Sequence, residues 1–160
     1  MSEKQKKWNK YFIQIMDAVA QGSKDPSTKV ACVIAGPDHE IRATGYNGLP
    51  RGCAESEARN ERPEKYFWYE HSERNAIYNA CRHGAALFGC TAYVSNFPCC
   101  DCARALIQVG IKDIYVRTLS KEHSARWQEY YERTTVMLKE AGIFVYRLNE
   151  DGSIVDEQTL

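Results

Sequence analysis

The sequence predicts a layered α/β domain built on a mixed sheet. Segments with helical and strand periodicity alternate along the second half of the chain, which is typical of parallel strands joined by helices. A β-hairpin is expected between residues 29 and 46, and its antiparallel strands make the sheet mixed. The length of 160 residues leaves room for one hydrophobic core, so we expect a single domain.

The chain is expected to open with an amphipathic helix over residues 2–21. Ser2 and Gln5 suit a capping box at its start, and Gly22 suits its end. Its apolar residues recur at the spacing that places them on one face of a helix: Trp8, Tyr11, Phe12, Ile15, Met16 and Val19. We expect this face to pack on the sheet.

Residues 29–35 are predicted to form a buried strand, and residues 40–46 its hairpin partner, joined by Gly-Pro-Asp turn chemistry. Residues 47–70 are polar and interrupted by Gly and Pro, which predicts a loop long enough to be functional. The loop ends in four aromatic residues at 66–69. These side chains would either line a pocket or anchor the loop to the core.

Regular periodicity returns after His71. Gly84, Gly110 and Gly142 suit the ends of the three predicted helices. Helices are predicted over residues 72–82, 99–109 and 122–141, and strands over residues 91–96, 113–117 and 143–148.

The charge balance of the chain limits its partners. Lys plus Arg and Asp plus Glu both total 21, so the formal net charge is zero. A nucleic-acid-binding module normally carries a basic excess, so we expect no nucleic-acid partner. Residues 1–10 are charged and no long apolar run follows, so we expect no signal peptide, no membrane partner and a cytoplasmic location.

Seven cysteines are the unusual feature of the composition. In a reducing compartment they are expected to be metal ligands, a catalytic thiol or small buried residues before disulfides. Cys32 and Cys81 fall in a predicted strand and a predicted helix, and we expect both to be buried.

Two short segments carry residues that suit a metal centre. Cys99 and Cys102 stand three residues apart at the start of a predicted helix, where Pro98 suits the first turn. One Zn²⁺ could bind both sulfurs, and His71 at the start of an earlier helix would be the third ligand. Three protein ligands leave a fourth position for water, which is typical of catalytic zinc. A structural zinc would need a fourth protein ligand, and Cys100 is expected to point away.

Glu73 favours the catalytic interpretation. It stands two residues after His71, near the metal without being needed to bind it. A carboxylate beside a water on zinc can shuttle protons between that water and a substrate. The combined pattern H-x-E and P-C-x-x-C is the signature of zinc-dependent deaminases. A C-x-x-C pair alone could also be a redox pair, but no thioredoxin-like pattern precedes it here.

Further blocks resemble the deoxycytidylate deaminases of the zinc-dependent cytidine-deaminase superfamily. The resemblance covers about residues 10 to 117. The matching blocks are DPSTKV at residues 25–30, GYNGLPRG at 45–52, EHSERNAI at 70–77, FPC at 97–99 with its continuation to residue 108, and GIK at 110–112.

The resemblance implies a three-layer α/β/α sandwich with a mixed five-stranded sheet, as one domain over residues 1–160 with a core at about 8–148. It also implies zinc-dependent hydrolysis of dCMP to dUMP and ammonia, with Glu73 moving protons. On this basis Asn47 and Ser72 are assigned to substrate binding. Arg74 stands where the family usually has an aliphatic residue. This departure leaves a deaminase of another free base or nucleoside, such as cytidine or guanine, as an alternative function. A tRNA adenosine deaminase is a more remote alternative.

Regulation and assembly are also implied by the resemblance. Family members are homo-oligomers, and many respond to dCTP and dTTP through the Gly-Tyr-Asn-Gly block. That block could also be a plain turn, since Asn-Gly is turn chemistry, but its place at the start of the long loop favours a function. The residues that could contact a phosphate or a regulatory nucleotide are Lys24, Lys29, Tyr46, Gly48 and Arg51.

Overall fold

The structure, a computed structural model, describes residues 1–117 and 128–155. Its helices are α1 (Glu3–Ala20), the 3₁₀ helix η1 (Glu57–Asn60), α2 (Lys65–Trp68), α3 (Ser72–His83), α4 (Cys100–Gln108) and α6 (Gln128–Glu140). Its strands are β1 (Ala31–Ala35), β2 (Ile41–Tyr46), β3 (Thr91–Val94), β4 (Asp113–Arg117) and β5 (Phe144–Leu148).

The strands form one mixed sheet in the order β2-β1-β3-β4-β5. Strand β1 is antiparallel to both of its neighbours, whereas β3, β4 and β5 are parallel. Both the hairpin and the parallel second half are therefore confirmed. Because β1 runs against β2 and β3, its amino end lies at the same sheet edge as their carboxyl ends. This edge carries the candidate site.

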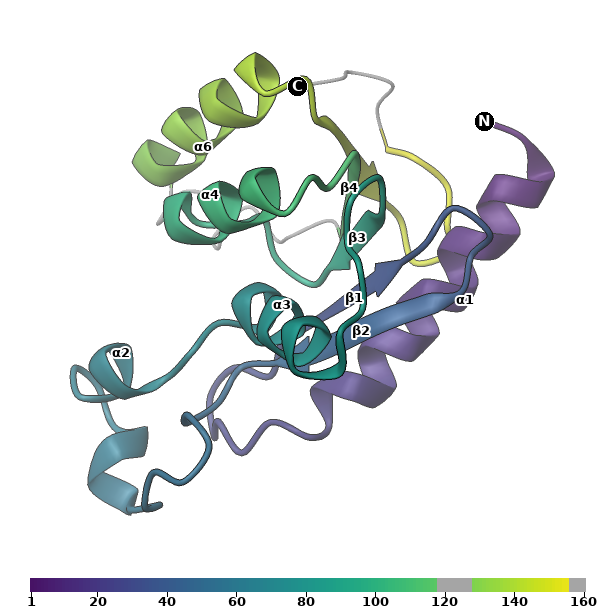
Figure 1. Cartoon of the computed structure of the whole chain (residues 1–160). Coiled ribbons are helices and arrows are strands. Elements are labelled where there is room, and N and C mark those ends of the chain that lie inside the picture. Colours follow the sequence, from purple (N-terminus) through teal and green to yellow (C-terminus); the bar gives the residue numbers. More distant parts are fainter. Residues whose placement is uncertain (118–127, 156–160) are drawn as a thin grey trace.

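Helices cover both faces of the sheet (Figure 1), which confirms the three-layer sandwich. On one face, Phe12 and Met16 of α1 pack with Val33 of β1. On the other face, Cys32 and Ile34 of β1 pack with residues of α3, α4 and α6. Strand β1 is buried throughout, as a central strand covered on both sides must be.

The start of α1 confirms only part of the predicted capping box. The Ser2 hydroxyl accepts a hydrogen bond from the Gln5 backbone N–H at 3.1 Å. The Gln5 side chain does not return to Ser2 but donates to Asn9 Oδ1 at 2.9 Å. Gly22 lies beyond the end of the helix, where an added Cβ would come within 2.6 Å of the Tyr46 ring.

Several predicted boundaries and environments differ from the structure. The strand predicted at residues 29–35 begins at Ala31, and the one predicted at 91–96 ends at Val94. The loop at residues 47–70 contains two short helical turns, η1 and α2. Residues 122–127 of the predicted last helix lie outside the described residues. Cys81 is exposed rather than buried, because it lies on the solvent side of α3.

Candidate active site

Two helices begin at the candidate metal centre. His71 is the N-cap residue of α3, and Cys99 is the N-cap residue of α4. Cys102 lies in the first turn of α4. Pro98 precedes the N-cap instead of lying in the first turn, so that detail of the prediction was wrong. Since helix N-termini carry partial positive charge, they favour thiolates at this position.

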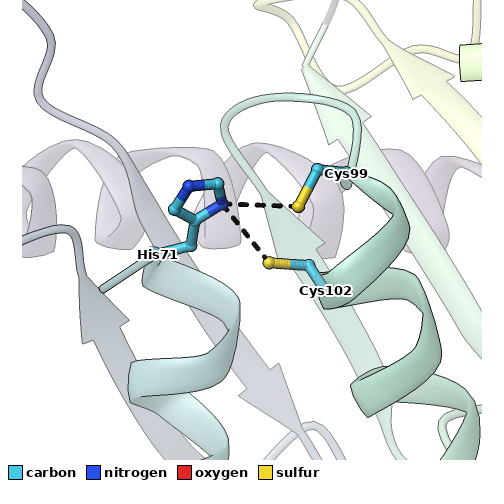
Figure 2. A group of neighbouring side chains, drawn as sticks. All are labelled: His71, Cys99 and Cys102. Carbon is cyan, nitrogen blue, oxygen red and sulfur yellow. Dashed lines mark hydrogen bonds between the residues drawn. The ribbon is translucent and has the colours of Figure 1, made fainter. Parts of the chain in front are cut away.

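The His71 imidazole faces both sulfur atoms (Figure 2), as the dashed lines show. Its Nδ1 lies 3.5 Å from Cys99 Sγ and 3.5 Å from Cys102 Sγ. Tetrahedral zinc with ordinary Zn–S and Zn–N bonds requires about 3.6 Å between nitrogen and sulfur. All three ligand atoms lie within 4.8 Å of one another, so the three side chains are close enough to bind one zinc ion.

The pKa values of the two cysteine thiols are shifted in opposite directions. A hydrogen bond from Cys102, with a smaller contribution from His71, lowers the pKa of Cys99 to about 3 despite burial. The same sulfur–sulfur interaction, together with burial, raises the pKa of Cys102. The two pKa shifts have opposite directions because each sulfur is the main interaction partner of the other. A metal ion binds cysteine as the thiolate, so a divalent cation here would displace the thiol protons.

Glu73 points into the same region from the first turn of α3. Its side chain is buried, and burial raises the pKa of its carboxyl, although His71 opposes this shift. The Ser72 hydroxyl donates a hydrogen bond of 3.0 Å to Glu73 Oε2. A carboxyl group with a raised pKa holds and releases a proton closer to neutral pH than an exposed one does.

A cavity of about 190 Å³ lies at this sheet edge and includes His71, Glu73 and Cys99 in its wall. The remaining wall comes from the segment before β1, the end of β2, the loop before α3, the residues after β3 and the start of α6. Tyr66 and Tyr69 of the aromatic segment line the cavity, whereas the Phe67 side chain is 79% exposed. Two of the four aromatic residues thus form part of the pocket wall.

Comparison with known proteins shows to which family the chain belongs. Residues 6–118 match the cytidine and deoxycytidylate deaminase zinc-binding region. The chain belongs to this family. The match confirms both the resemblance of the sequence and the prediction of zinc as the cofactor.

Individual relatives agree with the family match. An uncharacterized deaminase of Aliivibrio fischeri is 39% identical, with 87% of this chain and 92% of that protein aligned. The mouse deoxycytidylate deaminase is 40% identical over 67% of this chain, which spans 62% of the mouse protein. The dCMP deaminase of the cyanophage S-TIM5 has the same fold, with a TM-score of 0.69 at 22% identity over 92% of this chain and 99% of that one.

Cys100 takes no part in the metal cluster. Its sulfur lies 3.8 Å from the Tyr130 carbonyl oxygen and accepts a hydrogen bond of 3.5 Å from the Thr134 hydroxyl. Both partners belong to α6, so Cys100 points away from the other two cysteines as predicted. The metal-ligand group found among the described residues comprises three side chains.

Asn47 lines the cavity but its side chain is already engaged. Its Nδ2 donates to Asp25 Oδ2 at 3.2 Å and to the Thr28 carbonyl at 2.9 Å, and its Oδ1 accepts from the Val30 N–H at 3.0 Å. The amide is therefore held in one orientation, and an incoming group could use only the remaining lone pair of Oδ1. Substrate binding by Asn47 stays a prediction.

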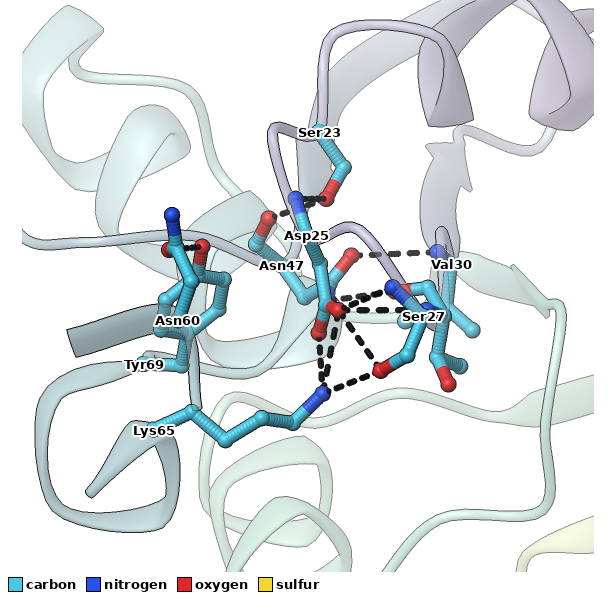
Figure 3. Close-up of polar contacts among 9 residues, drawn as sticks. Ser23, Asp25, Ser27, Val30, Asn47, Asn60, Lys65 and Tyr69 are labelled. Atoms are coloured by element: carbon cyan, nitrogen blue, oxygen red, sulfur yellow. Dashed lines mark hydrogen bonds and ion pairs between the residues drawn. The ribbon is translucent and has the colours of Figure 1, made fainter. Parts of the chain in front are cut away.

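A buried ion pair forms part of the same wall (Figure 3). The Lys65 Nζ contacts Asp25 Oδ1 and Oδ2 at 3.0 and 2.8 Å and donates to Ser27 Oγ at 2.7 Å. Burial works to raise the pKa of Asp25, but the hydrogen bonds from Lys65 and Ser27 outweigh it and lower that pKa. No local pattern in the sequence indicates this pair, since its two residues lie 40 positions apart.

The residues predicted for phosphate or regulator binding divide into two groups. Lys24, Tyr46 and Gly48 line a second cavity of about 150 Å³, where Lys24 is ion-paired with Glu55. Lys29 and Arg51 line neither cavity, and Arg51 donates a hydrogen bond to Asn79 Oδ1 on α3. Tyr69 belongs to the walls of both cavities.

Gly45 lets α3 lie directly against β2. A Cβ at this position would lie 2.3 Å from both the Ser72 carbonyl oxygen and the Ala76 nitrogen. The start of α3, which carries Ser72 and Glu73, can therefore pack directly against β2 because residue 45 has no side chain. Part of the Gly-Tyr-Asn-Gly block thus has a packing role in addition to any role in binding.

Proposed function

We propose that this chain is a zinc-dependent deaminase that hydrolyses dCMP to dUMP and ammonia. The observation that carries the proposal is a His71, Cys99 and Cys102 group at zinc spacing, with the buried Glu73 carboxyl in the same cavity. The relatives named deoxycytidylate deaminase, and the cyanophage enzyme whose structure holds dCMP and dUMP, support this substrate.

His71, Cys99 and Cys102 would hold the metal and leave one coordination position free for a small ligand. When bound, zinc supplies Lewis-acid activation of a water molecule. Glu73 would accept one proton from the attacking water and deliver it to N3 of the pyrimidine as the water oxygen bonds to C4. It would then move the second proton from that oxygen to the exocyclic amino group, so that the bond from C4 to this nitrogen breaks, the C4 carbonyl forms and ammonia leaves.

The chain's other cavity residues suit a pyrimidine. Phe97 and Tyr131 meet edge to face with ring centroids 5.0 Å apart, and both line the cavity. They provide an apolar wall for a flat ring. The Ser72 hydroxyl, which donates to Glu73, holds the carboxylate in place and favours its charged form.

The remaining expectations concern regulation, assembly and location. The second cavity, with Lys24, Tyr46 and Gly48 in its wall, is the place we propose for dCTP or dTTP. Assembly into a homo-oligomer follows the family pattern. All seven cysteines are free, which suits the reducing cytoplasm where free nucleotides occur. No helix among the described residues is long and apolar enough to cross a membrane.

The experiment measures ammonia release by the purified, zinc-loaded protein from dCMP, cytidine, deoxycytidine, guanine and a tRNA anticodon stem, side by side. We expect turnover of dCMP, and we expect Glu73→Ala to abolish it while the zinc content stays unchanged. Glu140→Ala, at an exposed position of α6, serves as the matched control and should keep its activity. Retained activity in Glu73→Ala would refute the proton-transfer role, and absence of dCMP turnover would refute the substrate.

A further inference from the structure

The loop before α3 contributes the cationic part of the cavity wall. We propose that Arg62 on this loop binds the 5′-phosphate of the substrate and so makes the site prefer a nucleotide to a nucleoside. This inference rests on the proposed function, and it names a residue that determines the substrate class.

Three basic residues line the cavity: Arg62, Lys65 and His71. The His71 imidazole is turned toward the two cysteine sulfurs. The three ammonium hydrogens of Lys65 face three acceptors, the two carboxylate oxygens of Asp25 and the hydroxyl of Ser27. Neither group therefore offers a free charge to a ligand.

Arg62 differs from both in its surroundings. Its side chain is exposed, and no carboxylate among the described residues forms an ion pair with it. Its guanidinium carbon lies 5.9 Å from the centroid of the Tyr66 ring, which also lines the cavity. A guanidinium group has five donors in a planar fork that matches two phosphate oxygens at once.

The ion pair between Lys65 and Asp25 prepares the wall for an anion in two ways. It neutralises the Asp25 carboxylate, which would otherwise repel a phosphate at this wall. It also fixes the backbone near Arg62, since the buried Lys65 side chain ties the start of α2 to the segment before β1. The Lys65 N–H also bonds to the Glu61 carbonyl at 2.8 Å, which closes the turn that contains Arg62.

The other candidate cations are less suitable. Lys29 and Arg51 line neither cavity, and Lys24 lies in the second cavity, where it is paired with Glu55. Among the described residues, Arg62 is thus the cation of the active-site cavity whose charge is not matched by a carboxylate. Removing it should weaken binding of phosphate without changing the chemistry at C4.

The test compares kcat/KM for dCMP and for deoxycytidine, which lacks the phosphate, in the zinc-loaded protein. We expect Arg62→Gln to lower the value for dCMP by about 10- to 100-fold, the range for one charged hydrogen-bonding partner, and to leave deoxycytidine unchanged. Arg62→Lys should recover part of the loss. Arg82→Gln removes an exposed cation from α3 that lines neither cavity, and should behave as the wild type.

A second measurement does not depend on turnover. Titration with dUMP and with deoxyuridine measures the affinity for each ligand, and the difference between them is the contribution of the phosphate. Arg62→Gln should lower the affinity for dUMP alone. Equal losses for both ligands, or an unchanged preference for the nucleotide, would overturn the role of Arg62 while dCMP deamination stands. A wild-type protein that does not turn over dCMP would instead overturn the proposed function.

Discussion

Breaking the ion pair between Lys65 and Asp25 should destabilise the protein more than breaking the surface pair between Lys24 and Glu55, which joins the same two segments. The two side chains of the buried pair are only 8% and 3% exposed. Lys65→Met removes the cation while keeping a side chain of similar length. The Asp25 carboxylate would then be buried without its counter-charge, and the desolvation of an unpaired charge is expensive.

The expected loss in the free energy of unfolding depends on the hydrogen bonds that Asp25 still accepts in the Lys65→Met variant. Removing one partner of a buried pair typically costs about 3–5 kcal/mol. Asp25 would still accept hydrogen bonds from Ser27, Thr28 and Asn47. We therefore expect a loss near the lower limit, about 3 kcal/mol, because these donors continue to stabilise the charge. In a protein of this size that corresponds to a Tm lower by roughly 6–12 °C.

Urea unfolding at pH 7, with the zinc concentration held constant, measures this loss. Lys24→Met is the matched control, because Lys24 also pairs with a carboxylate of this region but both side chains are mostly exposed. The free energy of unfolding should hardly change in that variant. Adding Asp25→Asn to Lys65→Met should restore part of the loss. Equal effects of Lys65→Met and Lys24→Met, or no recovery in the double variant, would refute the reasoning.

Two further predictions concern packing and pH. Gly45→Ala should lower the free energy of unfolding by about 1–3 kcal/mol and reduce dCMP turnover, because its Cβ meets the backbone of Ser72 and Ala76 at 2.3 Å. Gly48→Ala, where the nearest atom is 3.8 Å away, should remain near wild type in thermal unfolding. The pKa of Asp25 is lowered in the folded protein, so as pH falls the carboxyl is protonated in the unfolded chain before it is protonated in the folded one. The stability that the Asp25 carboxylate contributes is therefore fully present above the ordinary pKa of 3.8 and is lost as pH falls through the pKa of the folded state. In a urea series from pH 6 to pH 3, Asp25→Asn should lose less stability than the wild type; parallel curves would contradict this.

The regular elements and the metal ligands could be predicted because their signals are local. The helix that begins directly after His71 and contains Glu73, and the one that contains Cys102, are marked by periodicity and by glycines at their ends. Cys99 and Cys102 lie within one turn of chain, so their spacing alone places both sulfurs together. The strand pairing of the hairpin follows from a short turn in the same way.

The wall of the cavity could not be predicted in this way. The loop at residues 47–70 has no periodicity, so neither the helical turns within it nor the direction of its side chains was visible. Lys29 and Arg51 are candidates for phosphate binding because they are basic and lie within matching blocks, whereas Arg62 lies outside those blocks. Which cation reaches the cavity depends on how this loop folds over the sheet edge.

The sequence by itself thus determined the kind of chemistry, since His71, Glu73, Cys99 and Cys102 are residue types whose spacing suits a zinc-dependent deaminase. It also determined the layered fold, because hydrophobic periodicity shows which faces must be buried. Tertiary structure alone decided which charges are paired and which remain available. Pairing depends on distances between segments far apart in the chain, and these are set by packing around the sheet rather than by neighbouring residues.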